Sequence, residues 1–285
     1  MSGAVVAGPF RLGLGRFRRH RSGMVGAGLV AGFVMVAVAA PLLAPHSPIA
    51  ASWTTIRQAP SWAYWMGTDE IGRDELSRVI WGARASLAAG VVSVLIAGAI
   101  GVPTGVVAGC AGGWVDAVLS RIVDAMLAIP FLILAIALAA FLGPNLRNAM
   151  IAIGISTAPV FMRVARAATL DVMVKDFIEA ARAVGNPPWR IALAHVVPNI
   201  VAPVLVQASL SIATAIIAEA SLSFLGLGEQ PPLPSWGSML NAGQQFLTQA
   251  PWLAVFPGLG IFLAVLGFNL MGDGLRDVLD TRRRG

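Results

Sequence analysis

Hydrophobic residues run through this chain in long stretches that polar and charged residues interrupt only briefly. A helix needs about 20 apolar residues to cross the hydrocarbon core of a bilayer. Stretches that are free of charge and long enough to do so lie at 22–45, 85–115, 125–146, 196–218 and 252–272. The fourth of these reaches residue 228 if Glu219 is tolerated within it. Each stretch therefore predicts a membrane-spanning helix.

A shorter apolar stretch lies at 148–162, between Arg147 and Arg163. Arginines at the ends of a short apolar helix extend their side chains toward water and so lengthen the crossing. With this stretch included, the sequence predicts an all-α membrane protein of about six transmembrane helices. The first, 24–45, follows a basic leader (1–23) but exceeds the roughly 7–15 apolar residues typical of a signal peptide, so we expect it to be retained.

The composition supports a lipid environment for most of the chain. Hydrophobic residues make up 57% of the sequence and charged residues 12%, whereas an ordinary soluble domain is about 25% charged. The 20 Lys and Arg against 14 Asp and Glu could also indicate binding to nucleic acid. The basic leader, however, lies directly before an apolar run and carries no known nucleic-acid-binding motif. We therefore expect membrane lipid as a partner and no nucleic acid.

The distribution of Lys and Arg predicts the orientation, because cytoplasmic loops carry an excess of positive charge. With six spans both termini lie on one side, and that side holds 15 of the 20 Lys and Arg, in the leader, at Arg121, in 163–198 and in the tail (274–285). The other side holds Arg57, Arg73, Arg78, Arg84 and Arg147. We therefore expect both termini and the 163–198 loop in the cytoplasm, and the 46–84 segment outside.

Prolines and glycines within the apolar stretches predict kinked and closely packed helices. Prolines occur at positions 103, 130, 159, 203 and 257, and neighbouring helices can satisfy the carbonyls that a proline leaves free. Gly101, Gly105 and Gly109 repeat at intervals of four, which makes a glycine face that another helix can approach closely. That helix belongs either to this chain or to a second subunit, and the sequence does not distinguish the two.

Enzyme chemistry finds little support in the sequence. The histidines, His20, His46 and His195, lie in different loops or tails, and none has a partner at metal-ligand spacing. The single cysteine, Cys110, cannot form an intrachain disulfide. A P-loop requires G-x-x-x-x-G-K-[ST], but the only lysine, Lys175, follows a valine. We therefore expect no enzyme activity, metal or cofactor in this chain; if ATP drives the protein, another chain hydrolyses it.

Glu219 is the one clear ionisable residue within a predicted span. Such residues are costly in lipid and commonly functional, so a gate or substrate contact near the outer mouth is one interpretation. The other, which we favour, is a structural hydrogen bond near the end of the fifth span. A single carboxylate does not provide a proton pathway, which counts against an ion-driven secondary transporter.

The polar loop at 163–198 is organised as two helices joined by a glycine. Gly185 fits the position just past a helix end, where a left-handed backbone is needed. Asn186 then fits the N-cap of a second helix and Pro187 its first position, where a missing N–H is harmless. Trp189 lies in the following turns, which Pro198 is expected to end. The pattern predicts a rigid elbow that projects from the membrane, as a docking surface requires.

This elbow resembles the EAA loop of ABC-importer permeases, whose pattern is E-A-A, three residues, Gly, nine residues, then I-x-L-P. The matching positions are Glu179, Ala180, Ala181, Gly185 and Pro198. His195 and Val197 stand where the pattern has Ile and Leu, and His before V-V-P-N is similar to the variant found in peptide-type permeases. In that family the loop holds a coupling helix that docks in a cleft of a cytoplasmic ATPase.

Two further stretches resemble the second permease subunit of dipeptide, oligopeptide and nickel importers. They are MGTDEIGRDELSRVIWGARASL (66–87) and EASLSFLGLGEQPPLPSWGSML (219–240). The first contains the external signature of that subunit, at Thr68, Asp69, Gly72, Arg73 and Asp74. The spacing of Asp74 and Arg78 also predicts an i, i+4 ion pair on a short amphipathic helix. Whether this segment contacts substrate or only anchors the chain at the interface stays open.

The resemblance implies a type I ABC importer permease, a multi-pass protein of the bacterial cytoplasmic membrane. Its implied partners are a homologous permease chain, two ATPase subunits that carry ATP and Mg²⁺, and an external substrate-binding protein. The implied coupling residues are Glu179, Ala180, Ala181, Gly185, Asn186, Pro187, Trp189, His195 and Pro198. The transmembrane domain would extend over 85–273. Import of short peptides by alternating access is the expected function; nickel or haem-like cargo, or an ATP-independent transporter, are alternatives.

Overall fold

The computed structural model describes residues 17, 18 and 20–279, and these are almost entirely helical. Most of the predicted leader and the last residues of the tail fall outside the described part. The long elements are α2 (Arg21–Val38), α4 (Glu75–Ala111), α5 (Gly113–Leu127), α6 (Phe131–Leu142), α7 (Leu146–Met173), α10 (Val197–Phe224) and α12 (Trp252–Leu279). The short ones are α3 (Ala40–Leu43), α8 (Asp176–Ala183), α9 (Pro188–Ile191) and α11 (Trp236–Gly243), with 3₁₀ turns at Trp53–Thr55 and Gln244–Phe246 and a π-helix, η2 (Ala192–Val196).

Five described helices are long and apolar enough to cross a membrane, and the number rises to six if the bent pair α5 and α6 is one span. The two members of that pair meet at 89°, so the prediction of one continuous third span over 125–146 is wrong. The physical reason is Pro130, which has no backbone N–H and disfavours a helical conformation in the residue before it. The helix therefore stops at Leu127 and restarts at Phe131 in another direction.

Helix α7 is longer than the predicted fourth span, which was expected to end at residue 162. Its charged residues are paired with acids on α5: Arg163 Nη2 lies 2.6 Å from Asp124 Oδ1, and Arg166 forms a two-pronged ion pair with Asp116. The helix continues to Met173, past the point where charges begin, and its arginines meet acids of α5 there. The polar loop accordingly starts later than position 163.

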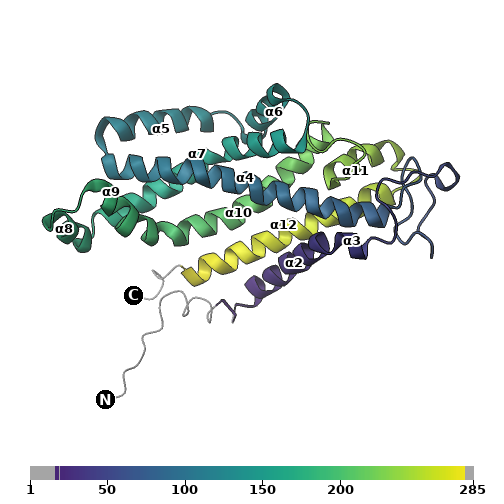
Figure 1. The fold of residues 1–285 in the computed structure, drawn as a ribbon, viewed down its shortest axis with the longest axis horizontal. Coiled ribbons are helices and arrows are strands. Elements are labelled where there is room, and N and C mark those ends of the chain that lie inside the picture. The colour runs from purple at the N-terminus through teal and green to yellow at the C-terminus, as the bar shows by residue number, and fades with distance from the viewer. Residues whose placement is uncertain (1–16, 19, 280–285) are drawn as a thin grey trace, which may run out of the picture.

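The glycine face of α4 packs against α7 of the same chain, which resolves the alternative left open by the sequence. A Cβ atom added to Gly101 would lie 2.4 Å from the carbonyl oxygen of Ala158, and one added to Gly105 would lie 2.5 Å from that of Met162. Real Cβ atoms do not approach so closely, so only glycine permits this spacing of the two helices. Figure 1 shows α4 and α7 running side by side through the bundle.

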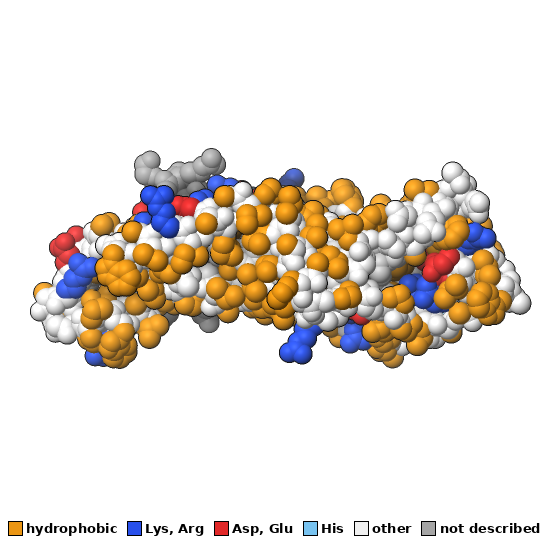
Figure 2. Space-filling view, turned by 90° about the horizontal axis from the view of Figure 1, so that it is seen from above, with side chains coloured by type: hydrophobic (Ala, Val, Ile, Leu, Met, Phe, Trp, Pro, Cys, Tyr) orange, Lys and Arg blue, Asp and Glu red, His pale blue; other side chains and the backbone are white. Residues whose placement is uncertain are grey.

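The bundle has two distinct ends (Figure 1). Helices α8 and α9 project at one, here called the elbow end, and α11 and the 44–74 segment lie at the other, the loop end. The start of α2 and the end of α12 are joined by a 3.0 Å contact between His20 Nε2 and Asp277 Oδ2. Figure 2 shows hydrophobic side chains along most of one face between charged groups near its two ends, as expected for a protein surrounded by lipid.

Candidate functional site

The first helix of the elbow, α8, ends in a hydrogen-bonded C-terminal cap. Gly185 has φ +83°, and its N–H donates to the carbonyl of Arg182 at 2.9 Å. The N–H of Asn186 donates to the carbonyl of Ala181 at 3.2 Å. These two bonds form a Schellman motif, in which a left-handed residue satisfies the last free carbonyls of the helix. The predicted position of Gly185 just past the helix end is confirmed.

The start of the second helix lies one residue later than predicted. Helix α9 begins at Pro188, with Pro187 as its N-cap residue, so the assignment of Asn186 to the N-cap and Pro187 to the first position is wrong. The side chain of Asn186 is used elsewhere: its Nδ2 donates to the carbonyl of Ala181 at 3.1 Å. Asn186 thus closes the helix before it rather than opening the helix after it.

Pro198 does not end the second helix of the elbow, contrary to the prediction. Helix α9 continues through η2 into α10, and Pro198 lies in the first turn of α10, where its missing N–H is tolerated. His195 lies within the π-helix, where its carbonyl accepts a 2.7 Å hydrogen bond from Asn199 Nδ2. Its ring centroid is 6.5 Å from that of Phe177 on α8. The elbow is therefore continuous with the fifth span rather than hinged to it.

One side of the elbow packs inward and the other is exposed. Ile178, Ala181, Ile191 and Val196 are buried in a cluster with residues of α4, α7 and α10. Glu179 and Ala180 are exposed, so only the second alanine of the E-A-A triplet faces the core. Large apolar side chains at the far side, here called the elbow tip, are exposed: Val184 (83%), Trp189 (66%) and Leu193 (64%).

At the loop end, residues of the TDxxGRD signature form a buried network with Arg78. Asp69 Oδ1 accepts from the backbone N–H of Arg73 at 2.8 Å, and its Oδ2 lies 2.5 Å from Arg73 Nε and 3.3 Å from Arg78 Nε. Arg73 also contacts Glu70 at 2.8 Å. Asp69 is therefore the anion shared by two buried arginines, and the predicted Asp74–Arg78 pair is wrong because Arg78 turns to Asp69.

The remaining signature residues shape the backbone around this network. Asp74 caps the start of α4, its Oδ2 accepting from the Ser77 N–H at 3.0 Å and from the Ser77 hydroxyl at 2.6 Å. Gly72 has φ +80°, and a Cβ there would lie 1.9 Å from the Ser52 carbonyl oxygen. Thr68 is fully buried, and its carbonyl accepts from Trp252 Nε1 at 3.2 Å. Helix α4 thus begins at Glu75, directly after the signature, and continues into the second span, as the sequence predicted for the helix that starts here.

Glu219 lies fully buried in α10 and joins it to α4. Its Oε2 accepts from the Ser86 hydroxyl at 2.9 Å, and its Oε1 accepts from the Ser223 hydroxyl at 2.7 Å. These contacts are those of a structural hydrogen bond between spans, the interpretation that the sequence favoured. In the adjoining loop, partial burial raises the pKa of the Glu229 carboxyl above its ordinary value, so this acid takes up a proton more readily than one in open water.

The predicted residues therefore form separate groups. The elbow residues lie at one end of the bundle, the signature network lies at the other, and Glu219 contacts neither. Within the described residues, no three His, Cys, Asp or Glu side chains are placed so that they could hold a metal ion. That the chain carries no cofactor stays a prediction.

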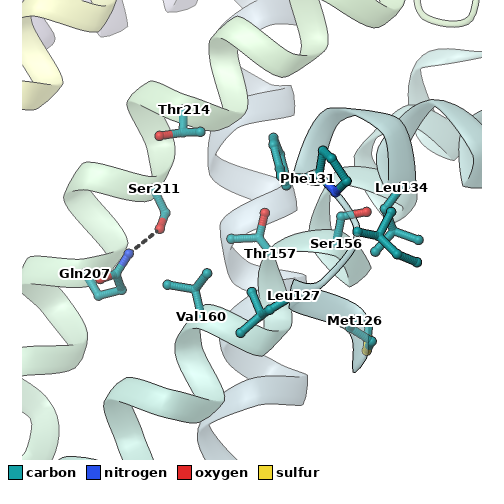
Figure 3. A pocket seen from close by; sticks show the side chains of 12 residues that line it. Met126, Leu127, Phe131, Leu134, Ser156, Thr157, Val160, Gln207, Ser211 and Thr214 are labelled. Carbon is teal, nitrogen blue, oxygen red and sulfur yellow. Dashed lines mark hydrogen bonds between the residues drawn. The ribbon is translucent and has the colours of Figure 1, made fainter. Parts of the chain in front are cut away.

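The sequence did not reveal a cavity at the break between α5 and α6, which is largely apolar but has one polar wall (Figure 3). Its volume is about 340 Å³, and α7 and α10 supply its polar wall. Gln207, Ser211 and Thr214 come from α10 at spacings of four and three, which places them on one face of the helix. This spacing of polar residues within an otherwise apolar run was the signal that could have revealed it.

Comparison with known families gives two matches. Residues 101–285 match the family described as "Binding-protein-dependent transport system inner membrane component". Residues 8–60 match the "N-terminal TM domain of oligopeptide transport permease C". Together the two matches cover most of the chain, including the elbow and the cavity.

Curated relatives resemble the chain over nearly its whole length. The dipeptide transport system permease protein DppC of Alkalihalophilus pseudofirmus is 44% identical over 276 residues, covering 97% of this chain and 91% of the relative. The probable D,D-dipeptide permease DdpC of Escherichia coli K12 is 44% identical and covers 88% of this chain and 85% of its own length. A glutathione permease, GsiD of Escherichia coli O157:H7, is 45% identical over 95% of this chain and 89% of its own length.

Among solved structures, the inward-facing MetNI methionine ABC transporter is similar with a TM-score of 0.59. The sequences are 23% identical, and the match covers 71% of this chain and 97% of that chain. At this identity the likeness is one of fold. It confirms the expected all-α membrane fold of a type I ABC importer permease, while the orientation of the termini stays a prediction.

Proposed function

This chain belongs to the binding-protein-dependent inner membrane components, as an ABC importer permease of the DppC/OppC type, and on that basis we propose that it forms half of the passage through which a bacterial importer moves short peptides. The observation that carries the proposal is the elbow. It presents an exposed apolar tip and runs without interruption into the fifth span through η2. A partner that pushes on the tip would therefore move α10 with it.

The proposed partner at the tip is an ATPase subunit. Apolar side chains such as Trp189 are enriched where proteins dock, and an aromatic in a fitting pocket often contributes much of the binding energy. Two such ATPases would bind ATP and Mg²⁺ and hydrolyse the nucleotide, one against this chain and one against a homologous permease. An external binding protein would deliver the solute at the loop end.

The mechanism we propose is alternating access by rigid-body motion. Closure of the ATPases displaces the elbow, and the packed helices swing between packings open to one side or the other. The close contact of α4 with α7 makes this pair one rigid body. The charge distribution supports an elbow in the cytoplasm and a signature network outside.

The names of the relatives favour peptides as cargo. Dipeptides, D,D-dipeptides and glutathione are all short peptides or closely related molecules. Nickel and haem-like cargo fit less well, because the cavity at the α5–α6 break offers no ionisable side chain to a metal.

The test is transport by the assembled importer in lipid vesicles, with its own binding protein and ATPases. We expect ATP-dependent uptake of a short peptide such as trialanine, and none when an ATPase subunit cannot hydrolyse ATP. Uptake of nickel or haem without uptake of peptide would replace the cargo assignment. Uptake that an ion gradient drives without ATP would overturn the importer mechanism.

A further inference from the structure

The cavity lies where α5 stops and α6 begins (Figure 3), and this break is near the middle of the length of the bundle (Figure 1). Ser156 and Thr157 lie within about one turn of the middle of α7, and Gln207 and Thr214 within about one turn of the middle of α10. The figure shows the α10 side chains facing those of α7 across the cavity. A solute crossing the membrane along these helices would meet this site halfway.

The polar lining of the cavity is uncharged. The hydroxyl and amide groups lie on the α7 and α10 side, the α5–α6 break contributes only apolar side chains, and no Asp, Glu, Lys or Arg takes part. Gln207 Nε2 donates to the Ser211 hydroxyl at 2.9 Å, which leaves its amide oxygen as an acceptor. Ser156 is only 4% exposed, and its hydroxyl has no hydrogen-bond partner among the described residues. A buried hydroxyl without a partner is uncommon, because it forfeits the free energy of a hydrogen bond.

The start of α6 adds hydrogen-bond donors to the same cavity. Pro130 and Phe131 line it, and α6 has no side-chain cap at its beginning. The first backbone N–H groups of a helix have no partner within the helix, and the helix dipole makes this end positive. Interrupted helices in transporters use such ends to hold oxygen atoms of the solute.

We propose that this cavity holds a short peptide in transit by its backbone. A carbonyl or carboxylate oxygen would lie at the start of α6, and peptide N–H and C=O groups would bond Gln207 and the hydroxyls of α7 and α10. Every peptide offers these groups whatever its side chains, so the site would accept many sequences. This inference rests on the proposed peptide cargo and adds the residues that contact it.

The first test compares trialanine uptake by the assembled importer carrying Ser156→Ala or Gln207→Leu. Loss of one uncharged hydrogen bond lowers transport efficiency by about three- to tenfold, and we expect a change of this size for each variant. Ser93→Ala is the matched control: Ser93 is also buried with an unpartnered hydroxyl, but it lies on α4 outside the cavity. Equal uptake by all three variants and the unmodified importer would overturn the inference and leave the peptide cargo standing.

A second measurement does not depend on the stability of these variants. The importer is assembled with a chain that carries Cys110→Ala, which removes the free thiol, and Gln207→Cys. The new cysteine at position 207 is then labelled with a small methanethiosulfonate reagent. We expect trialanine, supplied by the binding protein during transport, to slow the labelling. Labelling at the same rate with and without the peptide overturns the inference. So does complete protection in both cases, because the second permease chain then covers the cavity. If the assembled importer takes up no peptide at all, the proposed peptide cargo is overturned, and the inference about the cavity fails together with it.

Discussion

The hydroxyl of Ser86 donates a 2.9 Å hydrogen bond to Glu219 and so joins α4 to α10 inside the bundle. We expect the coupling free energy of this pair to be about 0.6 kcal/mol, since hydrogen bonds between membrane helices average this value. Glu219→Gln keeps an acceptor and should cost little uptake, whereas Glu219→Leu removes the acceptor of two buried hydroxyls, those of Ser86 and Ser223, and should lower thermal stability. A double-mutant cycle with Ser86→Ala in detergent measures the coupling.

Complete loss of uptake by Glu219→Gln in a normally assembled importer would give this carboxylate a part in transport itself. The structural assignment would then be wrong.

The contact between α4 and α7 makes a second prediction. Gly101→Ala adds a Cβ that would lie 2.4 Å from the Ala158 carbonyl oxygen, so we expect a loss of about 1–3 kcal/mol in stability from overpacking. Gly98→Ala is the matched control, because its Cβ would lie 3.9 Å from Phe161, an ordinary contact. Thermal unfolding of the two variants in detergent distinguishes them. Equal midpoints of thermal unfolding for the two variants would mean that α4 and α7 are not held at this spacing.

The signature network makes a third prediction. Asp69→Ala leaves two buried arginines without their shared carboxylate, and removing one partner of a buried ion pair costs about 3–5 kcal/mol. We expect poor assembly of the importer and easy proteolysis in the 44–74 segment. Glu70→Gln removes a partly exposed partner of Arg73 and should change stability by less than about 1 kcal/mol. If Asp69→Ala assembles normally but no longer responds to the binding protein, the signature acts in docking instead.

Gly185 makes a fourth prediction, because its backbone has φ +83°. A β-branched side chain disfavours this conformation by about 1–2 kcal/mol, while asparagine tolerates it. We expect Gly185→Val to loosen the elbow and lower peptide uptake per ATP hydrolysed, and Gly185→Asn to keep it. No atom lies within 4 Å of the added Cβ, so the effect would come from the backbone alone. Equal uptake per ATP in both variants would show that the cap does not matter for coupling.

The apolar runs and the glycines allowed much of the fold to be predicted. Each predicted span has a helix or a bent helix pair in the structure, because lipid forces backbone groups to bond within their own segment. Gly185 was predictable because the left-handed backbone past a helix end favours one residue type. Local rules of this kind need no knowledge of distant contacts.

What the sequence did not reveal depends on contacts between distant segments. On the part of α7 beyond residue 162, Arg166 pairs with Asp116, 50 residues away in the chain. Asp69 rather than Asp74 pairs with Arg78 because the loop folds back on itself. Even the one-residue error at Pro187 arose because the Asn186 side chain had an alternative acceptor at Ala181. The cavity forms only where α7 and α10 meet the break between α5 and α6, so no single stretch of sequence could reveal it.

The most direct test of the account is a crosslink from the elbow tip. The importer is assembled with a chain that carries Cys110→Ala and Val184→Cys, and it is treated with a short bifunctional maleimide. Val184 is 83% exposed. A cysteine at Trp62, which is 97% exposed at the loop end, is the control. The account predicts a crosslink to an ATPase subunit from position 184 and none from position 62. No ATPase crosslink from position 184, or equal yields from the two positions, would contradict it.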